Sequence, residues 1–152
     1  MAPDSTHIVC FGNELHGDDG FGPAVYEHLL AIGLPSGTRL FRADVSGISA
    51  TRCFEACDRA IVIDALRGYG TPGSLHQLDG GLATVEAPAG SHGAGVGALL
   101  ELLPAMLPCP PRITIIGTEI ERAQSFSPGL STTVAATVPR VADLALQLVR
   151  NG

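Results

Sequence analysis

Short runs of apolar residues, many of them β-branched, recur along the chain, and between them apolar residues fall at intervals of three and four. The runs predict strands and the spaced stretches predict helices. The expected strands span residues 7–11, 39–43, 59–63, 73–78 and 112–116. The expected helices span residues 20–34, 49–56, 94–107 and 132–150, and residues 80–93 are expected to form a loop.

Strands that alternate with helices are typical of a parallel sheet covered by helices on both faces. We therefore predict a three-layer α/β/α fold with a mostly parallel, twisted central sheet of about five strands. The chain has 152 residues, no internal repeat and no composition shift that would mark a domain boundary. Residues 1–152 are accordingly predicted to form a single domain.

Composition and charge limit the classes of function. A hydrophobic content of 45% with 16% charged residues is typical of a folded globular chain. The net charge of -6 disfavours binding to a phosphate backbone, so we expect no nucleic acid partner. No apolar run approaches the roughly 20 residues that a membrane span needs, and the first residues do not resemble a signal peptide. We predict a cytoplasmic protein with no membrane insertion.

Cysteine and lysine usage narrows the chemistry further. The chain has no lysine, which excludes a phosphate-binding Walker lysine or a Schiff base. Its four cysteines lack CxxC spacing and are predicted to be free thiols in a reducing compartment. Cys10 falls in an apolar strand and is expected in the core. Cys53 and Cys57 could share a metal, but no nearby histidine or third cysteine completes such a site.

Acidic residues follow several of the predicted strands. In open α/β sheets, ligands bind beyond the carboxyl ends of the strands. Asp18 and Asp19 lie where the first loop meets the first helix, a place where a carboxylate can also simply cap free N–H groups. Asp64 directly follows the apolar strand 59–63, and Asp44 follows the second strand. A buried carboxylate at these places must be hydrogen-bonded, paired or metal-bound.

A histidine completes a possible ligand set. His92 opens the predicted helix 94–107; taken alone, it is most simply a solvated loop residue. Asp19, Asp64 and His92 come from three segments that should meet at one edge of the sheet. Two carboxylates and one imidazole suit iron, nickel, manganese or zinc with open positions left over. Because no second histidine or cysteine accompanies them, the set suits a metal that arrives already held by other ligands.

These motifs resemble those of the hydrogenase maturation endopeptidases, the nickel-dependent processing proteases of [NiFe]-hydrogenase large subunits. The first loop, G-N-E-L-H-G-D-D-G-F-G at residues 12–22, is similar to the family's G-N-x-L-x-x-D-[DE]-G-x-G. Residues 62–65 look like its V-x-[VI]-D-A pattern, and Ser91-His92 is similar to its S-H segment. Further matches are Pro72-Gly73, Gly117, Glu119 and residues 129–131. The chain departs from the family at residues 44–47, where D-V-S-G replaces a D-G-G-T-like segment, and at Thr132, where proline is usual.

The resemblance implies a reaction and a metal. The implied substrate is the nickel-loaded precursor of a [NiFe]-hydrogenase large subunit, from which a C-terminal extension is cleaved. Carried over by position, the nickel ligands are Asp19, Asp64 and His92. The substrate supplies the nickel, and other divalent metals could substitute.

For the catalytic chemistry, the hypothesis is that the protein is an aspartyl-type endopeptidase. Asp44 and Asp19 are the candidate catalytic residues. Asp44 could instead orient a residue that contacts the metal or the water. Either the metal polarises the scissile carbonyl or a carboxylate activates water, and the residues do not decide between these routes. Backbone N–H groups of the first loop are expected to bind the substrate peptide. The candidate substrate-binding residues are Gly12, Asn13, Gly17 and Gly20.

Other functions fit part of the pattern. A nickel-binding chaperone or docking module for hydrogenase assembly would need the same ligands without proteolysis. A phospho-acceptor receiver-like domain also has acidic residues after its first and third strands, but it needs a lysine after its fifth strand. A serine hydrolase would need a G-x-S-x-G turn, which is absent.

His16 could assist the metal or simply be solvated. We expect a monomer, because the predicted elements leave no apolar stripe over.

Overall fold

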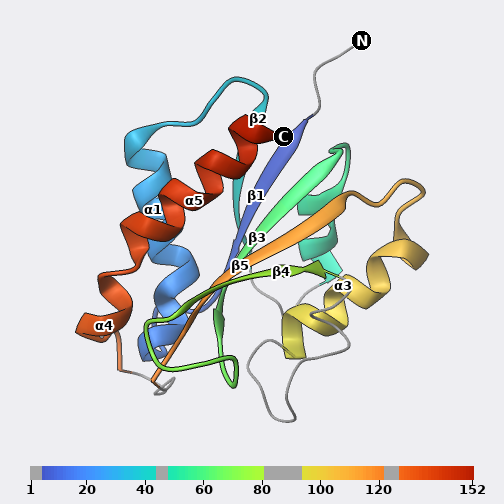
Figure 1. The fold of residues 1–152 in the computed structure, drawn as a ribbon. Coiled ribbons are helices and arrows are strands. Elements are labelled where there is room, and N and C mark those ends of the chain that lie inside the picture. The colour runs from blue at the N-terminus through green and yellow to red at the C-terminus, as the bar shows by residue number, and fades with distance from the viewer. Residues whose placement is uncertain (1–4, 44–47, 81–93, 122–126) are drawn as a thin grey trace.

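The computed structural model describes residues 5–43, 48–80, 94–121 and 127–152, and it has the predicted three-layer α/β/α fold (Figure 1). The strands are β1 (Thr6–Phe11), β2 (Thr38–Ala43), β3 (Arg59–Leu66), β4 (Leu75–Asp79) and β5 (Arg112–Glu119). The α-helices are α1 (Phe21–Ile32), α3 (Ala94–Met106), α4 (Thr132–Ala135) and α5 (Val138–Asn151). The described residues also form two 3₁₀ helices, η1 (Gly17–Gly20) and η2 (Ile48–Phe54).

The five strands form one sheet in the order β2-β1-β3-β5-β4. Neighbouring strands are parallel except at the β4 edge, where β4 runs antiparallel to β5. The prediction of a mostly parallel sheet of about five strands is therefore confirmed. Since β1, β2, β3 and β5 all end at the same edge, the loops that follow them meet there, as expected for this class of sheet.

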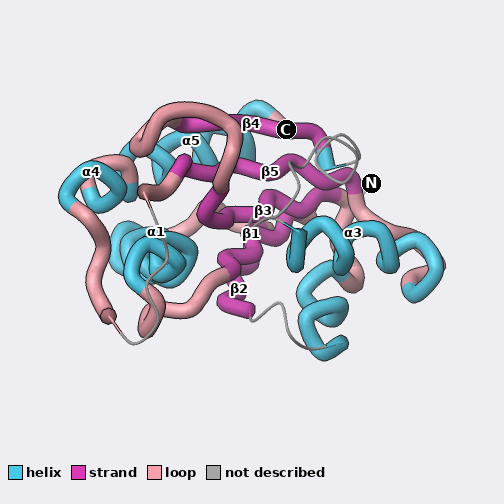
Figure 2. Tube along the Cα trace, turned by 90° about the horizontal axis from the view of Figure 1, so that it is seen from below, coloured by secondary structure: helices cyan, strands magenta, loops and turns pink. Residues whose placement is uncertain are grey.

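Helices cover both faces of the sheet. Figure 2 shows α1 and α5 on one face and α3 on the other. Side chains of each strand alternate between the two layers, so Ile8 and Cys10 pack against α1 and α5, whereas Val9 and Phe11 pack against η2 and α3. Side chains on both faces of β1 are buried, and this agrees with the continuous apolar run of residues 8–11.

The central strands are longer than their apolar runs. β3 does not end at Ile63 but continues to Leu66, and β5 continues to Glu119. In the paired part, Asp64 lies opposite Gly117. A Cβ atom on Gly117 would lie 2.4 Å from Cγ of Leu66, so only glycine lets the two strands stay paired here. Asp64 therefore belongs to the ladder, a correction to its predicted place just after the strand.

Two predicted helices have a different form. Residues 132–150 do not make one helix, because α4 ends at Ala135 and α5 begins at Val138. Pro139 lies in the first turn of α5, where its missing N–H is tolerated, whereas in a continuous helix its ring would clash with the Ala135 carbonyl. The Thr137 hydroxyl donates to the Val134 carbonyl at 2.7 Å, so this carbonyl at the end of α4 has a hydrogen-bond partner. The predicted helix at 49–56 is the 3₁₀ helix η2.

All four cysteines are free, as predicted, and Cys10 lies in the core. Within the described segments, no helix has the length and apolar character that crossing a membrane requires.

Candidate active site

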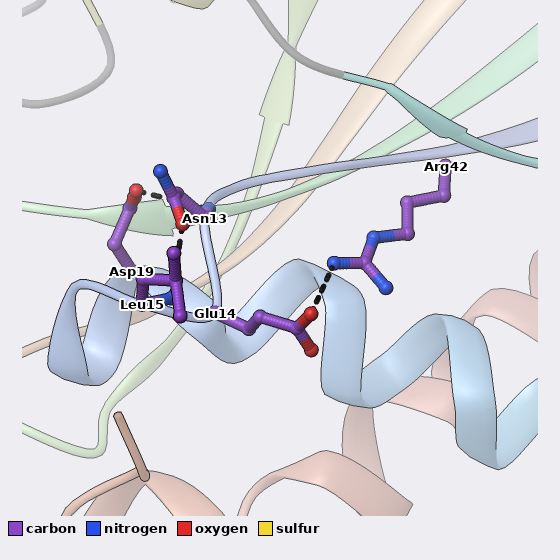
Figure 3. A network of polar contacts seen from close by, with 5 residues as sticks. All are labelled: Asn13, Glu14, Leu15, Asp19 and Arg42. Carbon is purple, nitrogen blue, oxygen red and sulfur yellow. Dashed lines mark hydrogen bonds and ion pairs between the residues drawn. The ribbon is translucent and has the colours of Figure 1, made fainter. Parts of the chain in front are cut away.

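The first loop folds back onto Asp19. The backbone N–H of Asn13 donates both to the Asp19 carbonyl and to Asp19 Oδ2, each at 3.1 Å. Gly12 has φ of +145°, and a Cβ atom there would lie 2.1 Å from the Asp19 carbonyl oxygen. The close approach of the two backbones thus needs glycine at position 12. The Asn13 side chain in turn accepts from the backbone N–H of Leu15 at 2.9 Å, which fixes the tip of the loop (Figure 3).

The two adjacent aspartates have different surroundings, although both are buried. Asp18 Oδ1 accepts from the Ser131 N–H at 2.6 Å, and its Oδ2 accepts from the Ser131 hydroxyl at 3.0 Å. A longer bond of 3.4 Å comes from the Glu121 N–H. Asp18 thus joins the first loop to the start of α4 and has a structural role. Asp19 is the member of the pair that acts electrostatically on Asp64.

Asp64 is a buried carboxylate on the face of β3 that packs against α3, with an exposure of only 3%. Burial raises its pKa well above the ordinary value, and the negative charge of Asp19 raises it further. The Ala65 N–H, which donates to Asp64 Oδ1 at 2.9 Å, acts in the opposite direction but does not offset these effects. The two predicted carboxylate ligands are therefore near enough to repel, and a cation between them would relieve that repulsion.

The surroundings of Asp64 include the first turn of α3. Asp64 lines a cavity of about 10 Å³ together with Tyr69, Val96 and Gly97. The loop that carries Tyr69 is held by Glu119, a buried carboxylate that accepts from the N–H groups of Gly68 and Tyr69. Sequence reasoning noted Glu119 only as a family match and missed this role. Its position at the end of a buried strand, like that of Asp64, was the available signal.

Two predicted site residues, His92 and Asp44, lie outside the described residues. Among the residues that the structure describes, no three His, Cys, Asp or Glu side chains come close enough to hold a metal ion. Cys53 and Cys57 thus have no third partner there. The structure brings Asp19 and Asp64 together, and the ligand role of these residues stays a prediction.

The predicted substrate-binding residues line two cavities on either side of the loop tip. Gly12 and Asn13 line one of about 390 Å³, together with Arg42 and Ala43. Gly17 and Gly20 line the other, of about 340 Å³. These positions agree with a role in binding substrate, although that role itself stays a prediction.

Two neighbours of these residues also have defined contacts. Glu14, which is exposed, pairs with Arg42 at 3.2 Å (Figure 3). His16 forms an isolated parallel bridge with Ser127 and is partly exposed. This bridge and the Asp18–Ser131 bonds both join the first loop to the segment before α4.

Comparison with known proteins identifies the family. The family model described as hydrogenase maturation protease matches residues 23–148. The chain belongs to the hydrogenase maturation protease family. The match begins just after the first loop, so the motif around Asp19 is a separate point of agreement. This hydrogenase maturation protease is accordingly an endopeptidase, which confirms the predicted family and class of enzyme.

Individual relatives agree with this assignment. The hydrogenase expression/formation protein HupD of Rhodobacter capsulatus is 28% identical over 140 residues, which cover 90% of this chain and 67% of that protein. The hydrogenase maturating endopeptidase HybD from E. coli has the same fold, with a TM-score of 0.81 at 21% identity, over 97% of this chain and 93% of that one. The [NiFe] hydrogenase maturation protease HybD from Thermococcus kodakarensis has a TM-score of 0.77 at 23% identity, over 95% of this chain and 98% of that one.

Proposed function

We propose that this endopeptidase removes a C-terminal extension from the nickel-loaded precursor of a [NiFe]-hydrogenase large subunit. One observation carries the proposal: Asp19 and Asp64 are two buried carboxylates that repel each other at the carboxyl edge of the sheet. Like charges held together in this way favour a bound cation. The substrate would bring that cation as nickel, already held by its own thiolates, and the carboxylates would complete the coordination.

His92 is proposed as the third ligand and Asp44 as a catalytic or supporting carboxylate. Val96, four residues beyond His92 in the sequence, lines the same small cavity as Asp64, which supports the first assignment. Ala43, directly before Asp44, lines the cavity that also contains Gly12 and Asn13, which supports the second. An imidazole added to two carboxylates gives a ligand set that suits nickel.

The protein residues would then do three things. Asp64, whose pKa is raised, loses its proton when the substrate's metal arrives, so that recognition depends on metal insertion. Backbone groups of the first loop hold the peptide next to the carboxylates. The proton of the attacking water passes to a carboxylate, Asp44 or Asp19, unless the metal ion alone provides the activation by polarising the scissile carbonyl.

The setting that we propose is the cytoplasm, with the protease acting as a monomer. The four free cysteines support a reducing compartment.

Processing of a purified precursor tests the function. Nickel-loaded and metal-free precursors are each incubated with the protease, and the products are weighed by mass spectrometry. We expect loss of a C-terminal peptide from the nickel-loaded form alone. Intact precursor that has lost its nickel to the protein would instead indicate a chaperone, and equal cleavage of both forms would contradict the role of nickel.

Single substitutions test the site in the same assay. Asp19→Ala, Asp64→Ala and His92→Ala are each expected to lower the rate of processing by at least about a hundredfold, because each removes a ligand to the substrate's metal. The exposed Asp143→Ala in α5 serves as the control. Thermal unfolding shows whether each variant is folded. Normal processing by all three variants would refute the assignment.

A further inference from the structure

A cavity of about 340 Å³ lies between the first loop, α1 and the segment before α4. Its walls are mostly apolar, and they include Leu15, Pro128 and Leu130. Leu15 is 52% exposed at the loop tip, although it is one of the larger apolar side chains of the molecule. An exposed apolar side chain in the wall of a cavity costs free energy in water, which burial against a partner would recover.

The walls of this cavity are held in place by hydrogen bonds between the first loop and residues 127–131. The Gly17 N–H donates to the Ser127 carbonyl at 2.8 Å, and Asp18 accepts both the N–H and the hydroxyl of Ser131. Leu15 itself is fixed through its backbone by the Asn13 side chain. The cavity is therefore formed before any partner arrives, which lowers the entropic cost of binding.

Charge indicates the kind of partner. Two carboxylates, Glu14 and Glu27, line the cavity, and Arg42 neutralises only Glu14. Among the described residues, Glu27 has no ion-pair partner, and it is exposed. A negative charge beside an apolar wall is complementary to a peptide segment with a basic side chain next to an apolar one.

The position of the cavity relates it to the proposed reaction. Gly17 and Gly20, the two ends of η1, line it, and Asp19 lies between them on the same turn. A peptide in this cavity would therefore contact the same short helix, η1, that carries the proposed metal ligand Asp19.

We propose that this cavity binds a segment of the large-subunit precursor, with an apolar side chain between Leu15 and Leu130 and a basic side chain beside Glu27. The inference rests on the proposed function and extends it by naming residues that determine substrate specificity. Leu15 and Glu27 bind the substrate without touching the reacting atoms, so they act on affinity and not on the chemical step.

Steady-state processing of the nickel-loaded precursor tests this. Leu15→Ser and Glu27→Lys are each expected to raise KM about tenfold with little change in kcat, since they weaken ground-state and transition-state binding alike. Matched controls are Leu30→Ser, at an apolar side chain of 58% exposure on α1, and Glu101→Lys, at an exposed carboxylate on α3. Neither lines the cavity, and both should keep the wild-type KM.

Binding of the same precursor, labelled with a fluorophore and followed by anisotropy, separates this proposal from the proposed function. The wild-type Kd should rise with salt, and Glu27→Gln should reduce that dependence, since it removes the charge and keeps the shape. If the wild-type protein binds the precursor without cutting it, the proposed function fails, and weaker binding by Leu15→Ser and Glu27→Lys still supports the docking cavity. Unchanged KM and Kd in both variants, tighter binding by Glu27→Lys, or no binding by the wild-type protein would overturn it.

Discussion

The carboxyl group of Asp64 lies where ionisation is unfavourable, because burial and the charge of Asp19 both raise its pKa. Below the ordinary pKa of an aspartate, near about 4, the group is neutral in the folded and the unfolded chain, and its contribution to stability is fully present. As the pH rises toward the raised folded pKa, the unfolded chain loses its proton first, and this contribution is lost. Asp64 therefore destabilises the metal-free protein at neutral pH.

Asp64→Asn should consequently stabilise the metal-free protein while it abolishes processing. The asparagine keeps an oxygen that can accept from the Ala65 N–H and has no charge to bury. We expect a Tm several degrees above wild type at neutral pH, at roughly 3 °C per kcal/mol, and almost no difference at acid pH. Calorimetry across this pH range measures it, with the exposed Asp143→Asn as control. A variant less stable than wild type at neutral pH would show that the carboxylate is stabilised by a contact that the described residues do not provide.

Gly12 is a second residue whose identity is determined by its surroundings. Gly12→Ala should lower the free energy of unfolding by at least about 3 kcal/mol, because the new methyl group would overlap the Asp19 carbonyl and the turn would have to move. Gly33→Ala is the matched control, since Gly33 also has a positive φ, but a methyl group there would meet no atom within 4 Å. It should cost only the backbone strain, ~1–3 kcal/mol. Urea unfolding compares the two, and equal losses would contradict the crowding argument.

At the scale of the elements, the bonds between Asp18 and Ser131 join η1 to α4 across a sequence separation of 113 residues. Ser131 also caps α4, since its hydroxyl accepts from the Val134 N–H at 3.4 Å. Both elements are short, with four residues each, and are stabilised mainly by what they contact.

A double-mutant cycle measures this link. Ser131→Ala should cost about 1 kcal/mol through the lost cap and hydroxyl bond, and Asp18→Ala about 2 kcal/mol because it leaves the Ser131 N–H without its acceptor. The double variant should cost about 1 kcal/mol less than the sum, because the two side chains share a bond. Chemical denaturation gives the three values, and strict additivity would show that the carboxylate and the hydroxyl do not act together.

The elements also show how far periodicity alone predicts this fold. Each predicted strand exists, and in β1 and β3 the reason is that a strand buried on both faces needs a continuous apolar run. The ends of β3 and β5 could not be predicted in this way, since their pairing continues past the apolar residues through Asp64 and Gly117. The break between α4 and α5 had a local signal in Pro139, which the regular apolar spacing around it concealed.

At the scale of the whole molecule, topology made part of the candidate site predictable. Parallel strands that end at one edge bring Asp19 and Asp64 together whatever the details of the loops. Long-range partners were not predictable, because nothing in the local sequence pairs Asp18 with Ser131 or places Leu130 in the same cavity as Leu15. The third proposed ligand, His92, depends on the motif alone, since it lies outside the described residues.

The monomer stays a prediction, and it can be tested directly. Among the described residues, large apolar side chains that are exposed lie at separate places on the first loop, α1 and α3. A stable dimer would need a contiguous apolar area of many such residues. Sedimentation equilibrium should therefore give a single species near the chain mass of 15.6 kDa. A mass twice as large would contradict this expectation.

The first and last described residues lie close together, at the starting ends of the parallel strands and away from their carboxyl ends (Figure 1). The Ser5 N–H donates to Asp58 at 2.9 Å, and the neighbouring Arg59 donates to the Leu148 carbonyl of α5 at 2.9 Å. Consequently, an affinity tag or a surface anchor fused at either end would attach to the side of the molecule where the strands start. Immobilised in this orientation, the molecule would leave the opposite edge of the sheet, where we propose that the site lies, open to the solution, which suits the protein to capture experiments on a sensor chip.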